Sequence, residues 1–155
     1  MLTPLKKQKT RRTRGSFAII ASRYNARYVD AMVAAAEHQL KEAGATKIRV
    51  IRVPGAFEIP AVAARLARAR PPCSALICLG VILRGQTSHA QQIADAVSGA
   101  LAQLQIQHAL PVIHEVLLLD NEAQAVVRCL DKQHNRGAEA AQTALEMVRI
   151  MASLP

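Results

Sequence analysis

Four short apolar runs alternate with longer stretches in which apolar residues recur every three or four positions. The runs cover residues 16–20, 47–53, 74–82 and 111–119. All four read as strands, and the third and fourth are nearly continuously apolar, which is typical of strands that are covered on both faces of a parallel sheet. The intervening periodicity predicts amphipathic helices around residues 29–40, 93–104 and 141–151. Strands and helices in this order form right-handed βαβ units, so the sequence predicts an α/β fold with a mainly four-stranded parallel sheet in a three-layer α/β/α domain.

The 155-residue length fits one domain, which we place at residues 16–155. Hydrophobic residues make up 51% of the chain and charged residues 20%, which argues against disorder. No apolar run reaches the roughly 18 residues of a membrane span, and no apolar segment of a secretory signal follows the basic N-terminus. The three cysteines show no CxxC spacing, which is typical of reduced thiols. We therefore expect a cytoplasmic protein without membrane contact.

The basic charge is concentrated at the N-terminus. Residues 1–15 hold six lysines and arginines and no acid, so most of the formal net charge of +9 lies there. The segment lacks apolar periodicity, which predicts a flexible, solvated tail. Contact between this tail and RNA is the alternative interpretation, although the near absence of aromatic residues disfavours single-strand binding.

Candidate site residues are found by following the predicted strands to their carboxyl ends. Ligands of open parallel sheets bind beyond these ends. The segments that follow the four strands are residues 22–25, 54–60, 84–89 and 119–121. We expect these four segments to meet at one edge of the sheet.

The third segment carries the strongest local signals. Ser88 and Gln91 have the spacing of a capping box, so a helix is expected to begin near His89. The amides of Gln86 and Thr87 would then point toward an anion at the helix N-terminus. His89 is a candidate general acid/base near neutral pH, and an exposed histidine in a polar turn is the equal alternative. The GxxxxGK[ST] pattern of a Walker A loop is absent.

Other candidates are ambiguous on the residues alone. Glu58 lies two residues before Pro60, a pattern typical of a helix start, which we favour over ligand contact. Tyr24 follows the first strand and is placed either to stack on a flat ring or to pack. Arg128 and Arg136 would ordinarily be solvated charges. The histidines lack zinc-ligand spacing, so we predict no metal site.

Several motifs in a fixed order, each weak alone, are together specific. They are RYN at 23–25, VPGAFEIP at 53–60, RGQTSH at 84–89, DN at 120–121, Arg128, and NRGAEAAQTALEM at 135–147. In this order and spacing they resemble the lumazine synthase family of riboflavin biosynthesis, over roughly residues 17–151. The resemblance implies a flavodoxin-like domain. It also implies a cofactor-independent condensation of 5-amino-6-(D-ribitylamino)uracil with 3,4-dihydroxy-2-butanone 4-phosphate, which gives 6,7-dimethyl-8-ribityllumazine, phosphate and water.

The resemblance also implies residue roles and an assembly. His89 would be the general acid/base, and Tyr24 would stack on the pyrimidine. The ribityl chain would be contacted by Ala56, Phe57 and Glu58. The pyrimidine edge would be contacted by Val81, Ile82 and Leu83. The phosphate would be contacted by Gln86, Thr87 and Arg128. His114, Arg128 and Arg136 would come from the neighbouring subunit of a homopentamer, or of an assembly of pentamers. Gln86, Ala90 and the pair His114-Glu115 depart from the usual family residues.

Three rival functions remain open on the sequence. The first is a homologue that binds ribityl-pyrimidines or flavins without catalysis. The second is an RNA-associated oligomeric scaffold that uses the basic residues 6–14. The third is the archaeal type of riboflavin synthase, a relative in the same superfamily.

Overall fold

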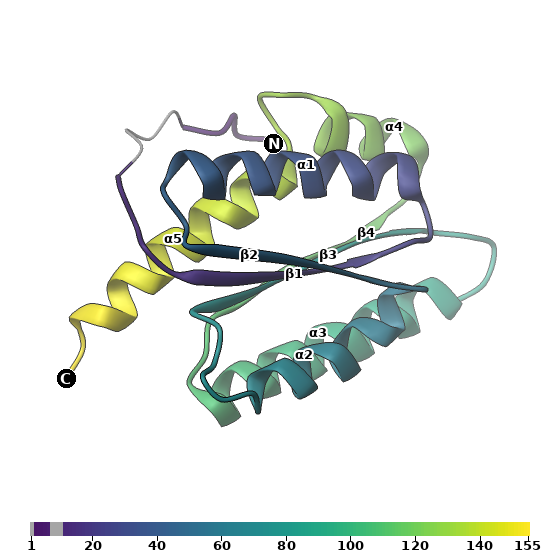
Figure 1. Ribbon diagram of the computed structural model, residues 1–155. Coiled ribbons are helices and arrows are strands. Elements are labelled where there is room, and N and C mark those ends of the chain that lie inside the picture. Colours follow the sequence, from purple (N-terminus) through teal and green to yellow (C-terminus); the bar gives the residue numbers. More distant parts are fainter. Residues whose placement is uncertain (1, 7–10) are drawn as a thin grey trace.

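The four strands form one parallel sheet, as expected. A computed structural model describes residues 2–6 and 11–155. The sheet has the order β2-β1-β3-β4 (Figure 1). Its strands are β1 (Ser16–Ser22), β2 (Lys47–Val53), β3 (Ala75–Leu83) and β4 (Val112–Leu119). The four predicted strands are confirmed, and the first runs on to Ser22.

Helices cover both faces of the sheet. One face carries α1 (Ala26–Glu42), α4 (Glu122–Ala125) and α5 (Arg136–Ser153), whereas the other carries α2 (Ile59–Ala67) and α3 (His89–His108) (Figure 1). The short 3-10 helix η1 (Ala56–Glu58) leads into α2, and the π-helical turn η2 (Val126–Leu130) continues α4. The predicted three-layer α/β/α fold is therefore confirmed. Among the described residues, no helix is both long enough and apolar enough to cross a bilayer.

The alternation of side chains along the central strands builds two cores. Ile19 and Ile77 belong to the cluster under α1 and α5, whereas Ile20 and Leu76 belong to the cluster under α2 and α3. All four side chains are fully buried. This two-sided burial explains why β1 and β3 read as continuous apolar runs in the sequence.

A backbone contact joins α5 to α1. A Cβ added at Gly137 would lie 2.0 Å from the carbonyl oxygen of Met32, so no larger residue fits there. Asn135 caps α5 because its Oδ1 accepts hydrogen bonds from the amides of Gly137 (2.8 Å) and Ala138 (3.2 Å). The start of α5, which carries Arg136, is thus fixed by packing and by capping.

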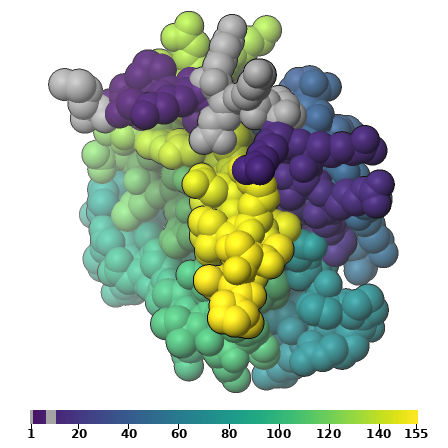
Figure 2. Space-filling model, turned by 90° about the vertical axis from the view of Figure 1, so that its left-hand side faces the viewer, coloured from purple at the N-terminus to yellow at the C-terminus, as the bar shows by residue number. Residues whose placement is uncertain are grey.

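The described parts of the N-terminal segment lie against the domain. The Leu5 amide donates to the Gln133 carbonyl (2.8 Å), and the Thr13 amide donates to the Ala43 carbonyl (2.8 Å). Thr13 is buried, and its hydroxyl accepts from Arg149 of α5 at 2.8 Å. Figure 2 shows these purple segments beside the yellow C-terminal helix. Lys7 and Lys9 of the predicted basic tail lie outside the described residues, and the mobility of the tail stays a prediction.

Candidate active site

A cleft of about 770 Å³ opens at the carboxyl ends of the strands. This volume is within the range of small-molecule sites. Segments that follow β1 and β2, the end of β3 and one face of α3 form its walls. Its lining comprises Tyr24, Asn25, Gly55, Ala56, Phe57, Glu58, Val81, Ile82, Leu83, His89, Gln92, Ile93 and Ala96. Three of the four predicted segments thus meet in the cleft, whereas the fourth, residues 119–121, contacts the segment 84–89 behind it.

The end of β3 presents unpaired backbone to the cleft. Its last four residues pair with β4 and no longer with β1. The Val81 carbonyl accepts from Asn25 Nδ2 at 2.7 Å on one side, and the Arg84 amide donates to Leu119 on the other. Because backbone groups alternate in direction along a strand, those of Leu83 point to the same side as those of Val81. Leu83 therefore offers an N–H and a C=O toward the cleft.

Asn25 fixes the loop opposite that edge. It adopts φ 58°, in the left-handed region that asparagine tolerates better than most residues. Its carbonyl accepts from the amides of Tyr28 and Val29 in the first turn of α1. Its side chain reaches Val81, which is 56 residues away in the chain. Sequence analysis assigned no role to Asn25, and its position after a strand was the only signal.

Gly55 brings an aromatic ring and a carboxylate together at the rim. A Cβ at Gly55 would lie 3.0 Å from the Tyr24 ring and 2.9 Å from Glu58 Oε2. The Gly55 amide donates to that same oxygen at 2.9 Å, which closes the η1 turn. Glu58 Oε1 stays available to a ligand, so the helix-start role and ligand contact are compatible. Tyr24 and Phe57 are 69% and 61% exposed, as suits stacking on a flat molecule.

His89 is the first residue of α3, so the predicted helix start is confirmed. Gln92, Ile93 and Ala96 line the cleft with it. Sequence analysis did not select these three, although spacings of three and four residues place them on the same helix face as His89.

The predicted capping box of α3 is wrong. Ser88 makes no side-chain capping bond, and the Gln91 side chain instead bonds Arg84 and Asp95. The Thr87 hydroxyl accepts a long bond of 3.4 Å from the His89 amide. The Gln91 side chain therefore bonds Arg84 before the helix and Asp95 one turn further along it, in place of the cap that the sequence spacing predicted.

Five of the predicted site residues do not line the cleft of their own chain: Gln86, Thr87, His114, Arg128 and Arg136. The first two are exposed in the loop before α3. Arg128 lies in η2. Arg136 begins α5 and is ion-paired with Glu139.

His114 has a fixed tautomer on β4, at the open edge of the sheet. Its Nδ1 accepts from the Val116 amide at 3.1 Å, so the ring proton resides on Nε2 and is donated to Ser98 Oγ at 2.7 Å. Partial burial lowers the pKa of His114, which favours the neutral ring. Burial raises the pKa of the adjacent Glu115 to about 7, against the opposing charge of Arg136. β4 therefore carries a histidine whose neutral form is favoured beside a carboxyl group that is partly protonated near neutral pH.

A protein-family model described as 6,7-dimethyl-8-ribityllumazine synthase matches residues 14–152. The chain belongs to this lumazine synthase family. Proteins named 6,7-dimethyl-8-ribityllumazine synthase are similar over nearly the whole chain. The protein from Stenotrophomonas maltophilia (strain R551-3) is 43% identical over 141 residues, which cover 90% of each chain. That from Xanthomonas euvesicatoria pv. vesicatoria is 42% identical over 147 residues, 94% of this chain and 95% of its own.

A third relative gives the same result. The protein of that name from Kineococcus radiotolerans is 41% identical over 143 residues, 89% of this chain and 88% of its own. The family resemblance drawn from the motifs is thereby confirmed. The region matched by the lumazine synthase model includes every residue that lines the cleft. In the described part of the chain, no group of three His, Cys, Asp or Glu side chains is arranged to hold a metal ion.

Proposed function

We propose that this chain condenses 5-amino-6-(D-ribitylamino)uracil with 3,4-dihydroxy-2-butanone 4-phosphate to give 6,7-dimethyl-8-ribityllumazine, phosphate and water. The chain belongs to the lumazine synthase family. The observation that carries this proposal is its cleft, in which an aromatic rim, an unpaired strand edge and an imidazole face the same space. A planar, hydrogen-bonding ring with a polyhydroxy chain fits these features. No cofactor is required, because the steps are additions, eliminations and proton transfers.

The pyrimidine is proposed to lie against Tyr24, with its polar edge on the backbone of Val81 to Leu83. The N–H and C=O of Leu83 match the alternating acceptors and donors of a uracil edge. Ala56, Phe57 and Glu58 would contact the ribityl chain, where the available Glu58 oxygen would accept a hydrogen bond from a hydroxyl group. In this proposed arrangement, the 5-amino group of the pyrimidine would lie on the side of the cleft that His89 lines.

His89 is proposed to move protons between successive intermediates. The amine adds to the ketone and water leaves to give an imine, phosphate is eliminated, and ring closure with loss of water completes the product. Each step needs a proton to be taken from nitrogen or carbon, or given to oxygen. A positioned imidazole typically contributes 10²–10⁴-fold to such steps. Holding the two substrates together supplies much of the remaining acceleration.

The phosphate is proposed to bind the loop amides of Gln86 and Thr87 and the guanidinium of Arg128. Since Arg128 does not line the cleft of its own chain, we propose that a neighbouring subunit of a cytoplasmic homopentamer supplies it, together with His114 and Arg136. Val126 and Val127, beside Arg128, are 39% and 36% exposed, which supports burial of η2 against another copy. Arg128 would thus hold the phosphate as it leaves.

The proposal is tested by mixing purified protein with both substrates and following the absorbance and fluorescence of the lumazine. Product must form faster than in the protein-free mixture, and a rate equal to that background refutes the proposal. Native mass measurement on the same sample tests the assembly. A mass that is not a multiple of five chains refutes the pentamer.

A non-catalytic ribityl-pyrimidine or flavin binder is the second candidate. The observation that favours it is the His114–Ser98 pair, which gives β4 a polar surface at a position where the family usually has phenylalanine. Calorimetric titration with riboflavin distinguishes the two functions. Tight riboflavin binding together with background product formation would select the binder.

A further inference from the structure

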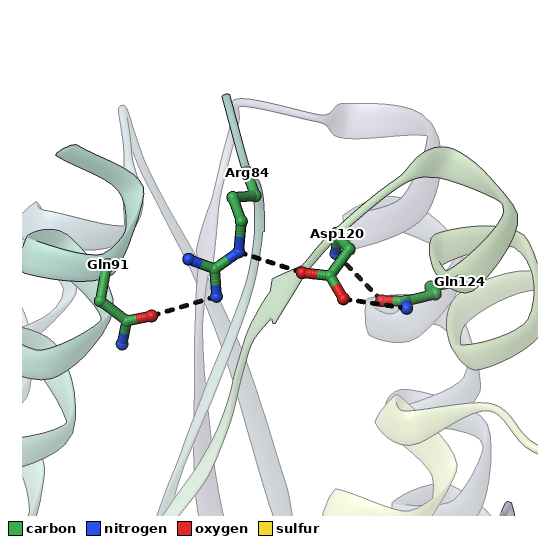
Figure 3. A network of polar contacts seen from close by, with 4 residues as sticks. All are labelled: Arg84, Gln91, Asp120 and Gln124. Atoms are coloured by element: carbon green, nitrogen blue, oxygen red, sulfur yellow. Dashed lines mark hydrogen bonds and ion pairs between the residues drawn. The ribbon is translucent and has the colours of Figure 1, made fainter. Parts of the chain in front are cut away.

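A single guanidinium joins three elements behind the cleft. Arg84, directly after β3, donates from Nε to Asp120 Oδ1 at 3.0 Å and from a terminal nitrogen to Gln91 Oε1 at 3.0 Å (Figure 3). Gln124 of α4 holds the same carboxylate from the other side. Its Oε1 accepts from the Asp120 amide at 2.9 Å, and its Nε2 donates to Asp120 Oδ2 at 3.3 Å. Arg84 thereby connects α3, the end of β4 and α4.

Asp120 lies in the field of two arginines. The hydrogen bonds from Arg84 and Gln124, together with the charges of Arg84 and Arg128, hold the pKa of Asp120 below its ordinary value. The Asp120 side chain is 63% exposed, so it has room to turn. Its carboxylate nevertheless pairs with Arg84, and among the described residues Arg128 forms no ion pair.

We propose that Arg84 is a positioning residue that keeps Asp120 from pairing with Arg128, and so leaves the Arg128 guanidinium available to the phosphate of the butanone substrate. The inference rests on the proposed function, which assigns Arg128 to that phosphate. One carboxylate stands within electrostatic reach of two guanidinium groups. If Arg84 is removed, Arg128 is the remaining arginine whose charge acts on Asp120, and an Arg128 that is paired with this carboxylate competes poorly for phosphate.

The test compares Arg84→Met with the wild type. Methionine keeps an apolar stem but removes every donor. The KM for the butanone phosphate should rise about fivefold, which is the upper range for a partly exposed ion pair. The KM for the ribitylaminouracil should stay within about twofold, since the Arg84 side chain bonds Asp120 and Gln91 and none of the residues proposed to bind that substrate. Arg68→Met, at the exposed end of α2, is the matched control and should change neither constant.

The decisive variant is the double change Arg84→Met with Asp120→Asn. It removes the competing carboxylate and should return the KM for the butanone phosphate to within about twofold of the wild type, an effect that simple loosening of the loop would not give. Arg84→Lys, which keeps a cation beside Asp120, should also remain near the wild type. If Arg84→Met fails to fold, the lysine variant and Asp120→Asn carry the test. A raised KM for the butanone phosphate in Asp120→Asn would then overturn the inference.

A second readout is independent of turnover. Calorimetric titration with inorganic phosphate should show weaker binding in Arg84→Met and recovery in the double variant. Equal increases in both KM values, or no recovery in the double variant, overturn the positioning role. Wild-type protein that binds phosphate but forms no lumazine contradicts the proposed function alone, and the titration then decides the inference. Wild-type protein that binds no phosphate removes the role of Arg128, and the inference with it.

Discussion

Replacement of Gly137 by alanine should be among the most damaging single-methyl changes in this chain. The added Cβ would lie 2.0 Å from the Met32 oxygen and 2.5 Å from its carbonyl carbon, whereas real Cβ contacts essentially never fall below 3.0 Å. Both obstructing atoms are backbone, so α5 must move away from α1 by the difference. Because buried alanines of α5 belong to the same core cluster as α1, the shift opens gaps along that contact.

Overpacking of this kind costs about 3 kcal/mol, the upper end of the usual range, because no side chain can turn aside. For a domain of this size that corresponds to a fall in Tm of roughly 6–12 °C. Urea unfolding followed by circular dichroism, at one fixed protein concentration, measures the change.

Gly99→Ala is the matched control for this variant. Gly99 lies within α3, and an added Cβ there meets nothing within 4 Å. Alanine should stabilise this helix by about 0.5–1 kcal/mol, because glycine is the poorer helix former. An unfolding free energy of Gly137→Ala within about 1 kcal/mol of the wild type would show that α1 and α5 separate freely, and would refute the close-approach reasoning.

Three further predictions concern the cleft and β4. Gly55→Ala should push the Tyr24 ring outward and raise the KM for the pyrimidine about tenfold, a cost of about 1.4 kcal/mol; steady-state kinetics that give an unchanged KM would show that the ring position is immaterial. Glu115 is protonated more readily in the folded chain than in the unfolded one, so its contribution to stability is present below pH 4.5 and is lost as the pH rises through about 7. Urea midpoints at pH 5 and pH 8 should therefore differ less in Glu115→Gln than in the wild type, and identical differences would contradict this assignment. His89→Ala should lower kcat by roughly 10²–10⁴-fold and leave the native mass unchanged, whereas full activity would remove the histidine from the mechanism.

Most of the fold could be predicted from the sequence because the hydrophobic patterns of strands and helices are local. β1 and β3 read as apolar runs because they are covered on both faces. The start of α3 at His89 was also predictable. Its cap was not, because Gln91 bonds Arg84 from the end of β3 and not Ser88 in its own turn. Residue spacing within one turn does not predict hydrogen-bond partners that lie outside the helix.

The candidate site likewise contains residues that the sequence predicts and residues that it does not. His89 and the segments 24–25 and 55–58 were found because they follow strands, and the doubly wound topology brings strand ends together. Asn25 gave no readable signal for its bond to Val81, since that contact spans 56 residues. Arg128 and Arg136 are ordinary surface charges by composition, and only the family resemblance singled them out. The role proposed for them in a neighbouring copy would leave no trace in the periodicity of their own chain.

The bond between the side chain of Asn25 and Val81 has a consequence for how a ligand is received. Where β1 ends, a single amide replaces the missing neighbour of β3 and keeps the loop at a set distance from the bare backbone of Leu83. A heterocycle that arrives there meets a preorganised surface, so its capture costs little conformational entropy. Entry and departure should then be governed by diffusion through the mouth of the cleft, with no slow rearrangement of the walls.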